Sequence, residues 1–189
     1  MQMKDFVISL LKNHLPKSYL YHNHKHTLYV FEKVMEIGRH EACTEKELEL
    51  LGVAALWHDT GYTIIYYKHE EESCKLARQY LPEYGYSTAF IEKVCGMIMA
   101  TKMPQSPKNK LEEIIADADL EYLGTVSFDS KAESLFKELH SLNPLMTEAQ
   151  WNQAQITFLQ KHHYFTKFCK ENREDFKCLN LSKLIQNKP

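Results

Sequence analysis

The sequence predicts an all-α protein, and three observations lead to this fold class. Apolar residues recur with the period of a helix along almost the whole chain. Its 189 residues include only 6 glycines and 6 prolines, which is few for a turn-rich β-sandwich. Hydrophobic residues make up 44% and charged residues 25%, the balance of a folded globular protein. Residues 1–189 are expected to form a single domain, since this length suffices for one core.

Two helices are expected before residue 40. The first contains Phe6 to Leu11 and stops before Pro16, which cannot continue a helix. The second runs from about His24 to Arg39. Its buried side comprises Leu28, Val30, Phe31, Val34 and Ile37.

A third helix begins at a recognisable start signal. Thr44 followed by Glu47 is a capping box, in which each side chain binds a free backbone N–H of the other residue. The apolar pattern continues to Trp57, and Gly61 is expected to act as the C-cap. The segment Thr63–Tyr67 has the composition of a strand but stands alone, so we interpret it as a loop.

The middle of the chain predicts two further helices and one loop. A helix is expected from about Lys68 to Leu81, closed by Pro82. Ser87 is expected to cap the next helix, which carries Phe90, Ile91, Val94 and Ile98. The segment Met103–Asn109 contains two prolines and is the clearest loop of the sequence.

The last third continues the helical pattern. A helix is expected from Leu111 toward Gly124. Thr147 and Gln150 resemble a second capping box. The segment Tyr164–Ile185 is mixed and aromatic, with helix expected at both ends. The aromatic residues of this region are interpreted as core or as an oligomer contact: Trp151, Phe158, Tyr164, Phe165 and Phe168.

Charge, cysteine content and hydropathy disfavour several classes of protein. The formal net charge of -2 gives no overall positive field to bind nucleic acid. The five cysteines show no C-x-x-C pair and are odd in number, which favours reduced thiols over a disulfide scaffold. No apolar run approaches the roughly 20 residues of a membrane span, and the N-terminus lacks the features of a signal peptide. We therefore expect a cytoplasmic protein that does not bind membranes.

Three segments combine metal-ligating side chains with apolar helices. His58 and Asp59 end the apolar segment AALWHDTGY, where an ionised carboxylate requires a cationic partner. His26 lies on the helix face that carries Val30 and Val34. The segment IADADLEYLG adds two aspartates at residues 117 and 119. Imidazole and carboxylate groups together suit a divalent ion, although a buried histidine is more often a hydrogen-bonded core residue. Spacing alone leaves both interpretations open.

The order His, His-Asp, Asp resembles that of the HD-domain metal-dependent phosphohydrolases. The resemblance extends to YHNHKHT, AALWHDTGY, the HEEES of residues 69–73, the ATK of residues 100–102 and DADLEYLG, which are similar to one bacterial subgroup. It covers roughly residues 15–125. It implies an HD-domain helical bundle over about 15–125, followed by a C-terminal helical extension over about 126–189.

The resemblance also implies a set of metal ligands. His26 would be the first ligand, and His58 with Asp59 the signature pair. Both Asp117 and Asp119 follow an alanine, so either could be the last ligand. We favour Asp119, because Ala118-Asp119-Leu120 is similar to a motif of the cyclic-nucleotide phosphodiesterases. Asp117 would then orient a ligand or a water molecule.

The expected catalytic residues are Asp59, His69, Glu70 and Lys102. Relatives with two metal ions would have a further histidine near residues 100–102, and this sequence has none there, which implies one metal. His69 is then available for substrate contact or proton transfer, with Glu70 as the alternative acid or base. Some related nucleotidases place a glutamate where this chain has Tyr62, which leaves the general acid open.

Lysines and polar residues near these segments complete the expected site. Lys102 could neutralise a phosphate oxygen, and Lys25 could do the same, although both also suit a solvated surface. The cavity entrance is expected to include Tyr21, His22 and Asn23.

These features predict a metal-dependent hydrolase of a phosphomonoester or phosphodiester, with a nucleotide or related small molecule as substrate. The cofactor would be one divalent ion, with Mn, Fe, Co, Ni, Zn and Mg all compatible. Two alternatives remain open: a regulatory nucleotide-binding HD domain without turnover, and a structural or partner-binding helical module whose metal site is vestigial. A homo-oligomer is compatible with the sequence, and no nucleic-acid or membrane partner is expected.

Overall fold

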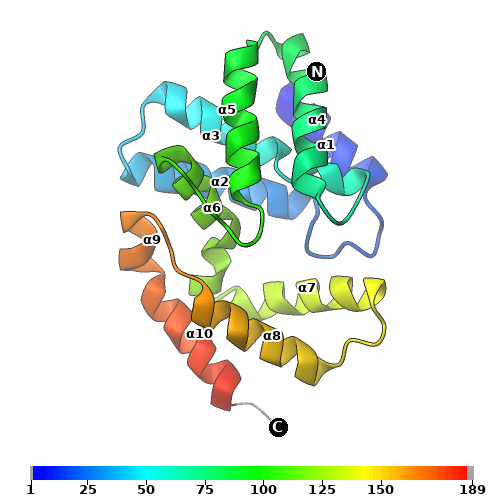
Figure 1. Ribbon diagram of the computed structural model, residues 1–189, viewed down its shortest axis with the longest axis vertical. Coiled ribbons are helices and arrows are strands. Elements are labelled where there is room, and N and C mark those ends of the chain that lie inside the picture. The colour runs from blue at the N-terminus through cyan, green and yellow to red at the C-terminus, as the bar shows by residue number, and fades with distance from the viewer. Residues whose placement is uncertain (1, 187–189) are drawn as a thin grey trace.

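The structure is a computed structural model that describes residues 2–186, and within these residues it contains helices and no strand (Figure 1). The expected all-α fold class is confirmed. The α-helices are α1 (Met3–His14), α2 (His24–His40), α3 (Glu45–Trp57), α4 (His69–Tyr80), α5 (Thr88–Ala100), α6 (Lys110–Leu120), α7 (Phe128–Leu142), α8 (Glu148–Lys161), α9 (Lys167–Asn172) and α10 (Glu174–Gln186). Three short 3-10 helices are η1 (Thr60–Thr63), η2 (Leu81–Tyr84) and η3 (Glu121–Gly124). No helix within residues 2–186 is long and apolar enough to cross a membrane.

The main core lies where α2, α3, α5 and α6 pack together (Figure 1). Helix α3 is its centre, because every residue from Leu50 to Trp57 is buried. Helices α2 and α6 contribute Val34 and Ile115, neither of which is exposed to solvent. Each such side chain stabilises the fold by about 1.5–3 kcal/mol relative to an exposed position. This packing brings the ends of α2, α3 and α6 to one place.

The helix N-caps that the sequence predicts are confirmed. Thr44 and Glu47 form the capping box of α3, and Thr147 and Gln150 form that of α8. The side chain of Ser87 accepts a hydrogen bond from the backbone N–H of Phe90 at the start of α5. The loop expected over Thr63–Tyr67 is confirmed from residue 64 onward, whereas Thr63 is the last residue of η1.

The expectation that Gly61 is a C-cap is wrong. Helix α3 ends at Trp57, and the chain continues through His58 and Asp59 directly into η1, which contains Gly61. The glycine is required for another reason. A Cβ atom at this position would lie 2.0 Å from the backbone oxygen of His69, so only glycine lets η1 approach the start of α4 this closely.

Helix α7 occupies a segment that was expected to belong to the C-terminal helical extension but in which the sequence analysis placed no individual helix. Its apolar residues Phe128, Ala132 and Leu135 follow helical spacing, but they are separated by charged and hydroxyl residues. Together with α8 it lies beneath the main core in Figure 1. A second apolar cluster joins these two helices to η3 and contains Tyr21, Tyr122, Leu123, Phe128, Ala132 and Leu159.

The C-terminal residues are tied to the core by polar contacts. Helix α10 packs against η3 and α8. Tyr164 is buried, and its hydroxyl donates a hydrogen bond to the backbone oxygen of Glu121. Arg173 forms an ion pair with the buried carboxylate of Glu121. The extension therefore shares buried contacts with the residues that precede it.

Candidate metal centre and adjoining cavity

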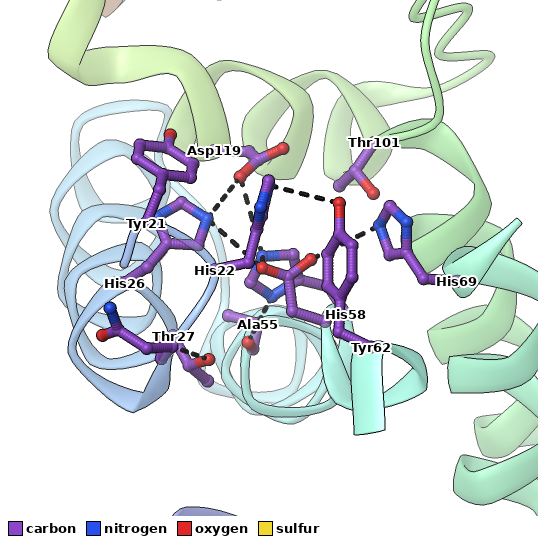
Figure 2. A network of polar contacts seen from close by, with 12 residues as sticks. Tyr21, His22, His26, Thr27, Ala55, His58, Tyr62, His69, Thr101 and Asp119 are labelled. Carbon is purple, nitrogen blue, oxygen red and sulfur yellow. Dashed lines mark hydrogen bonds and ion pairs between the residues drawn. The ribbon is translucent and has the colours of Figure 1, made fainter. Parts of the chain in front are cut away.

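Four predicted ligand side chains meet where α2, α3 and α6 converge, and Figure 2 labels three of them, His26, His58 and Asp119. His26 is in the first turn of α2, on the buried face that continues to Val30 and Val34. His58 and Asp59 directly follow α3. Asp119 is in the last turn of α6. Residues distant in the sequence are thus brought together by the packing of three helices.

The distances between these side chains suit a shared cation. One ligand atom each from His26, His58 and Asp119 lies within 4.8 Å of the others. The Oδ2 atom of Asp59 lies 3.4 Å from Nε2 of His26 and 3.2 Å from Nε2 of His58. The Oδ1 atom of Asp119 lies 3.0 Å and 3.6 Å from the same two nitrogens. Two imidazoles and two carboxylates therefore surround one point.

The hydrogen bonding of His58 leaves one nitrogen available. Its Nδ1 atom lies 2.8 Å from the backbone oxygen of Ala55, so Nδ1 carries the proton and Nε2 keeps its lone pair. Among the described residues, Nε2 of His58 and Oδ2 of Asp59 are buried without a hydrogen-bond partner. Buried polar atoms are rarely left unpaired, and a divalent ion would satisfy both. The donor set fits a metal.

The electrostatics of the cluster also favour a cation. Burial raises the pKa of Asp59 and of Asp119, but the adjacent His58 and His26 imidazoles outweigh it and hold both carboxyl pKa values below the usual range. Burial lowers the pKa of His58, yet the two carboxylates raise it well above its ordinary value. For His26 burial dominates and its pKa is lowered. The cluster thus attracts positive charge, supplied by a proton on His58 or by a metal that displaces it.

The structure brings Asp119, and not Asp117, to this cluster. Asp117 is fully buried, and its carboxylate accepts hydrogen bonds from the backbone N–H groups of Phe165 and Thr166 and from the Thr166 hydroxyl. These contacts anchor the segment before α9. The expectation that Asp117 orients a ligand or a water molecule is therefore wrong, because its oxygens face the C-terminal segment.

His69 and Glu70 lie beside the cluster, as expected. The Nε2 atom of His69 lies 3.5 Å from Oδ1 of Asp59, and the ring stacks on Tyr62 at 3.8 Å between centroids. Glu70 is buried, with Oε2 3.7 Å from Nδ1 of His69. Both residues line the cavity described below.

Neither lysine of the sequence analysis lines this cavity. The Nζ atom of Lys102 forms an ion pair with Glu71 at 2.5 Å on the partly exposed outer side of α4. Lys25 is exposed, and its backbone N–H binds the Asn23 side chain that caps α2. Thr101, next to Lys102, does line the cavity. The placement gives no support to a phosphate-neutralising role for either lysine.

A pair that the sequence analysis did not identify also lies next to the cluster. Glu138 of α7 is fully buried, and its Oε1 atom lies 2.5 Å from Nδ1 of His22. The same carboxylate accepts the backbone N–H groups of Tyr21 and His22. Burial lowers the pKa of His22, but Glu138 and the cluster carboxylates outweigh it, so the pKa is raised. The sequence placed His22 at the entrance but gave no sign of Glu138, which is 116 residues away.

The rings of His22, Tyr62 and His69 form a stack next to the cluster (Figure 2). The Tyr62 hydroxyl lies 3.2 Å from Nε2 of His22, and the two ring centroids are 4.3 Å apart. Two imidazoles, each beside its own carboxylate, thus lie on the same side of the metal cluster. Such an arrangement can give and accept protons at neutral pH.

A cavity of about 350 Å³ opens onto these groups. Its polar end includes His22, Asp59, His69, Glu70 and Asp119. Its other end is formed by α6, η3, α7 and α8 and is lined by Leu120, Tyr122, Leu123, Phe128, Ala132, Leu135, Trp151, Ala154, Gln155, Phe158 and Leu159. A mostly apolar pocket with a few convergent polar groups is typical of a small-molecule site.

The helical bundle and its converging His and Asp residues define a helical protein with a candidate metal centre. The sequence model of the HD domain matches residues 23–121, which is more than half of the chain. The chain belongs to the HD-domain family, and the resemblance noted in the sequence is confirmed.

Two solved structures show the same fold. One is a predicted HD superfamily hydrolase from an uncultured Thermotogales bacterium, with a TM-score of 0.63 and 20% identity over 96% of this chain and 88% of that one. The other is the Lin1889 protein from Listeria innocua, with a TM-score of 0.59 and 16% identity over 97% and 96% of the two chains. No curated protein matches the chain.

Proposed function

We propose that the protein is a metal-dependent hydrolase of small-molecule phosphate esters. The observation that carries the proposal is the convergence of His26, His58, Asp59 and Asp119, which are buried or partly buried, at the polar end of the cavity. Nε2 of His58 and Oδ2 of Asp59 are buried without a hydrogen-bond partner among the described residues, which favours a metal site over a cluster that only stabilises the fold. Membership of the HD-domain family supports the same reaction class.

The four cluster residues would hold one divalent ion. When bound, such an ion polarises a phosphoryl oxygen and makes water a stronger acid. Two nitrogens and two carboxylate oxygens are compatible with Mn, Fe, Co, Ni or Zn, and less so with Mg, which prefers oxygen ligands alone. One ion is proposed because the residues around Thr101 offer no further imidazole.

The neighbouring imidazoles are assigned to proton transfer on the basis of their positions. The Nε2 atom of His69 lies 3.5 Å from Oδ1 of Asp59, and the ring lies next to Glu70. His69 can therefore accept a proton from the attacking water molecule while Asp59 orients that water. His22 is bound to Glu138, which stabilises its protonated form, so it can supply the proton that the departing oxygen needs. The Tyr62 ring lies between the imidazole rings of His22 and His69 and holds both in place by stacking on them.

The test combines metal analysis with activity. We expect purified protein, prepared without chelator, to contain about one divalent ion per chain and to hydrolyse members of a phosphomonoester and phosphodiester panel. His58→Ala and Asp59→Ala should each reduce metal content and activity to background while the helical circular dichroism signal is retained, because each removes a ligand of a preformed site. His14→Ala and Asp129→Ala are matched controls, since both residues are exposed.

Two outcomes would contradict the proposal. Unchanged metal content in both ligand variants would exclude this cluster as the metal site. Full metal occupancy and tight nucleotide binding, without hydrolysis of any ester in the panel, would instead support the regulatory nucleotide-binding alternative.

A further inference from the structure

The apolar end of the cavity is built by the segment outside the family match. The HD-domain match ends at residue 121, whereas Phe128 and Leu135 come from α7, and Trp151 and Phe158 come from α8. Membership of the family therefore does not determine what this end of the cavity recognises. Its chemistry must be argued from the residues of this chain.

These residues form an aromatic surface. The Trp151 ring packs on Phe136 with centroids 6.0 Å apart and nearly parallel planes, so its indole is held in one orientation. Phe128, Trp151 and Phe158 all line the cavity. Aromatic side chains that are held in one orientation bind a flat aromatic ring most favourably. The two rings bury a large area against each other and pack in an offset-stacked or edge-to-face arrangement. An aliphatic sugar or glycerol group would place hydroxyls against them without hydrogen-bond partners.

The cavity contains few positive charges. Among its lining residues in the described chain there is no Lys or Arg, whereas Asp59, Glu70 and Asp119 are acidic. The nearby Lys131 of α7 places its ammonium 3.6 Å from the Tyr29 ring centroid. A di- or triphosphate would thus lack cations for all but the phosphoryl group at the metal cluster. The lining favours a single phosphate.

One polar side chain interrupts the apolar end. Gln155 of α8 is only 8% exposed and lines the cavity. Its Nε2 donates to Oδ1 of Asn152 at 3.3 Å, whereas its Oε1 is buried without a hydrogen-bond partner among residues 2–186. Because Oε1 is unpaired and the Gln155 side chain lines the cavity, a rotation of the amide would turn Oε1 toward a donor on the ligand. The pattern indicates a ring that carries an N–H or O–H group.

We propose that the substrate is a phosphate monoester whose alcohol part contains an aromatic ring with a hydrogen-bond donor for Gln155. The inference rests on the proposed hydrolase function. The phosphoryl group lies at the metal cluster, and the ring lies between Trp151, Phe158 and Leu135. The oxygen of water forms a bond to phosphorus, the ester P–O bond breaks, and the alcohol oxygen takes a proton, giving the free alcohol and inorganic phosphate. A cavity of about 350 Å³ accommodates one phosphate and one ring system.

The first experiment compares esters that differ in one feature, using the metal-loaded full-length protein. Phenyl phosphate and 4-aminophenyl phosphate differ by one donor group, as do purine riboside 5′-monophosphate and adenosine 5′-monophosphate. Glycerol 3-phosphate lacks a ring, and adenosine triphosphate adds two phosphates. We expect kcat/KM to be about tenfold higher for the donor-bearing member of at least one pair, and at least tenfold lower for glycerol 3-phosphate and the triphosphate. The pair that responds distinguishes a simple aryl group from a nucleoside.

The second experiment measures binding without turnover. Benzylphosphonate and 4-aminobenzylphosphonate contain a C–P bond that hydrolysis does not cleave, and methylphosphonate lacks the ring. Together with the 5′-phosphonate analogues of the two nucleosides, in which a C–P bond likewise replaces the ester bond, they are titrated calorimetrically into the metal-loaded protein. Gln155→Leu should remove the tenfold advantage of the donor-bearing ligand and leave the affinity of its partner unchanged. Gln160→Leu, an exposed position on the same helix, is the matched control. Trp151→Ala should weaken the binding of every ring-containing ligand but not that of methylphosphonate, with partial recovery in Trp151→Phe.

The outcomes separate this inference from the proposed function. Donor-selective binding that depends on Gln155, without hydrolysis of any ester, would support the aromatic site and overturn the enzyme proposal. Hydrolysis that is equally fast for ring-free esters, or faster for the triphosphate, would overturn the inference and leave the hydrolase function standing. Equal values for both members of both pairs would also overturn the inference.

Discussion

Two identical residues of α6 have different environments because of the geometry of one helix. Asp117 and Asp119 are separated by about 200° around the helix axis, so they face opposite sides. Asp119 faces His26 and His58, and Asp117 faces the backbone of Phe165 and Thr166. The same carboxylate thus serves the candidate metal centre in one position and the C-terminal packing in the other.

This difference predicts opposite phenotypes for two substitutions. Asp119→Ala should eliminate most metal binding with little loss of thermal stability, because it removes a ligand and relieves like-charge repulsion with Asp59. Asp117→Ala should retain the metal stoichiometry but reduce the free energy of unfolding by about 2–3 kcal/mol, since buried donors lose their acceptor. Elemental analysis and urea unfolding measure the two effects. Loss of metal in both variants to the same extent would contradict the assignment.

A pH effect is expected from Glu138. Burial raises its pKa, but the bound His22 and the two backbone N–H groups outweigh this, so its pKa in the folded protein is lowered. A carboxyl with a lowered folded pKa stabilises the protein fully above its unfolded value of about 4.5, and the contribution is lost as the pH falls through the folded pKa. Urea unfolding from pH 7 to pH 3 should therefore show a smaller acid-induced loss for Glu138→Gln than for the wild type. Asp129→Asn, at an exposed position of the same helix, is the control. Parallel pH profiles for the wild type and Glu138→Gln would contradict the expectation.

Much of the candidate site was predictable because its residues lie next to strong local patterns. His26, His58 and Asp59 occur at the ends of apolar helices, and periodicity indicates which side of a helix faces the core. Periodicity alone could not choose between Asp117 and Asp119 as the last ligand, because both lie in a buried helix. The choice of Asp119 depended on the resemblance to the HD-domain phosphohydrolases. The pair of His22 and Glu138 was not predictable, because its partners are joined only by the docking of α7.

At the scale of elements, the turn from α3 into η1 positions the signature pair. The Ser73 hydroxyl of α4 donates to the backbone oxygen of His58 at 2.6 Å and accepts the backbone N–H of Gly61 at 2.8 Å. Gly61 in turn allows the backbone of His69 to approach. The turn therefore fixes His58, Asp59 and His69 relative to one another through backbone contacts. Sequence reasoning found the glycine but not its role, because a C-cap and a close approach look alike in a sequence.

The Gly61→Ala substitution should disturb this turn. The added Cβ would lie 2.0 Å from the His69 oxygen, so the backbone must shift, and overpacking of this kind costs about 1–3 kcal/mol. We expect metal affinity to fall at least tenfold as Asp59 and His69 move. Gly96→Ala in α5 is a contrasting control, since its Cβ meets only a glutamate oxygen at 3.4 Å, and it should stabilise the helix by about 0.5–1 kcal/mol. Calorimetric metal titration and thermal unfolding distinguish the two. Wild-type affinity in Gly61→Ala would show that the turn tolerates a side chain.

At the scale of the whole molecule, the C-terminal extension completes both the core and the cavity. Tyr164 fills the core beside α6, Arg173 neutralises the buried Glu121, and Glu138 binds the segment before α2. The helical class of this region was predictable from its pattern. How this region packs against the core was not predictable, because the contacts involve single polar side chains whose partners are about 45 to 120 residues distant in the sequence. The Phe165–Asp117 and Tyr21–Glu138 pairs, for example, are separated by 48 and 117 residues.

These contacts predict that residues 1–125 do not fold on their own. Removing residues 126–189 would expose the apolar surfaces of α6 and η3 and remove the C-terminal partners of Asp117 and Glu121, at a cost of several kcal/mol, comparable with the total stability of a domain. The full-length protein should unfold in one calorimetric transition, whereas the 1–125 fragment should show reduced helicity, no cooperative melting and no metal retention. A fragment that binds metal and melts cooperatively, or two separate transitions in the intact chain, would instead establish the extension as an independent domain. In that case the aromatic end of the cavity would belong to an interface between two domains, and substrate selectivity would depend on how they dock.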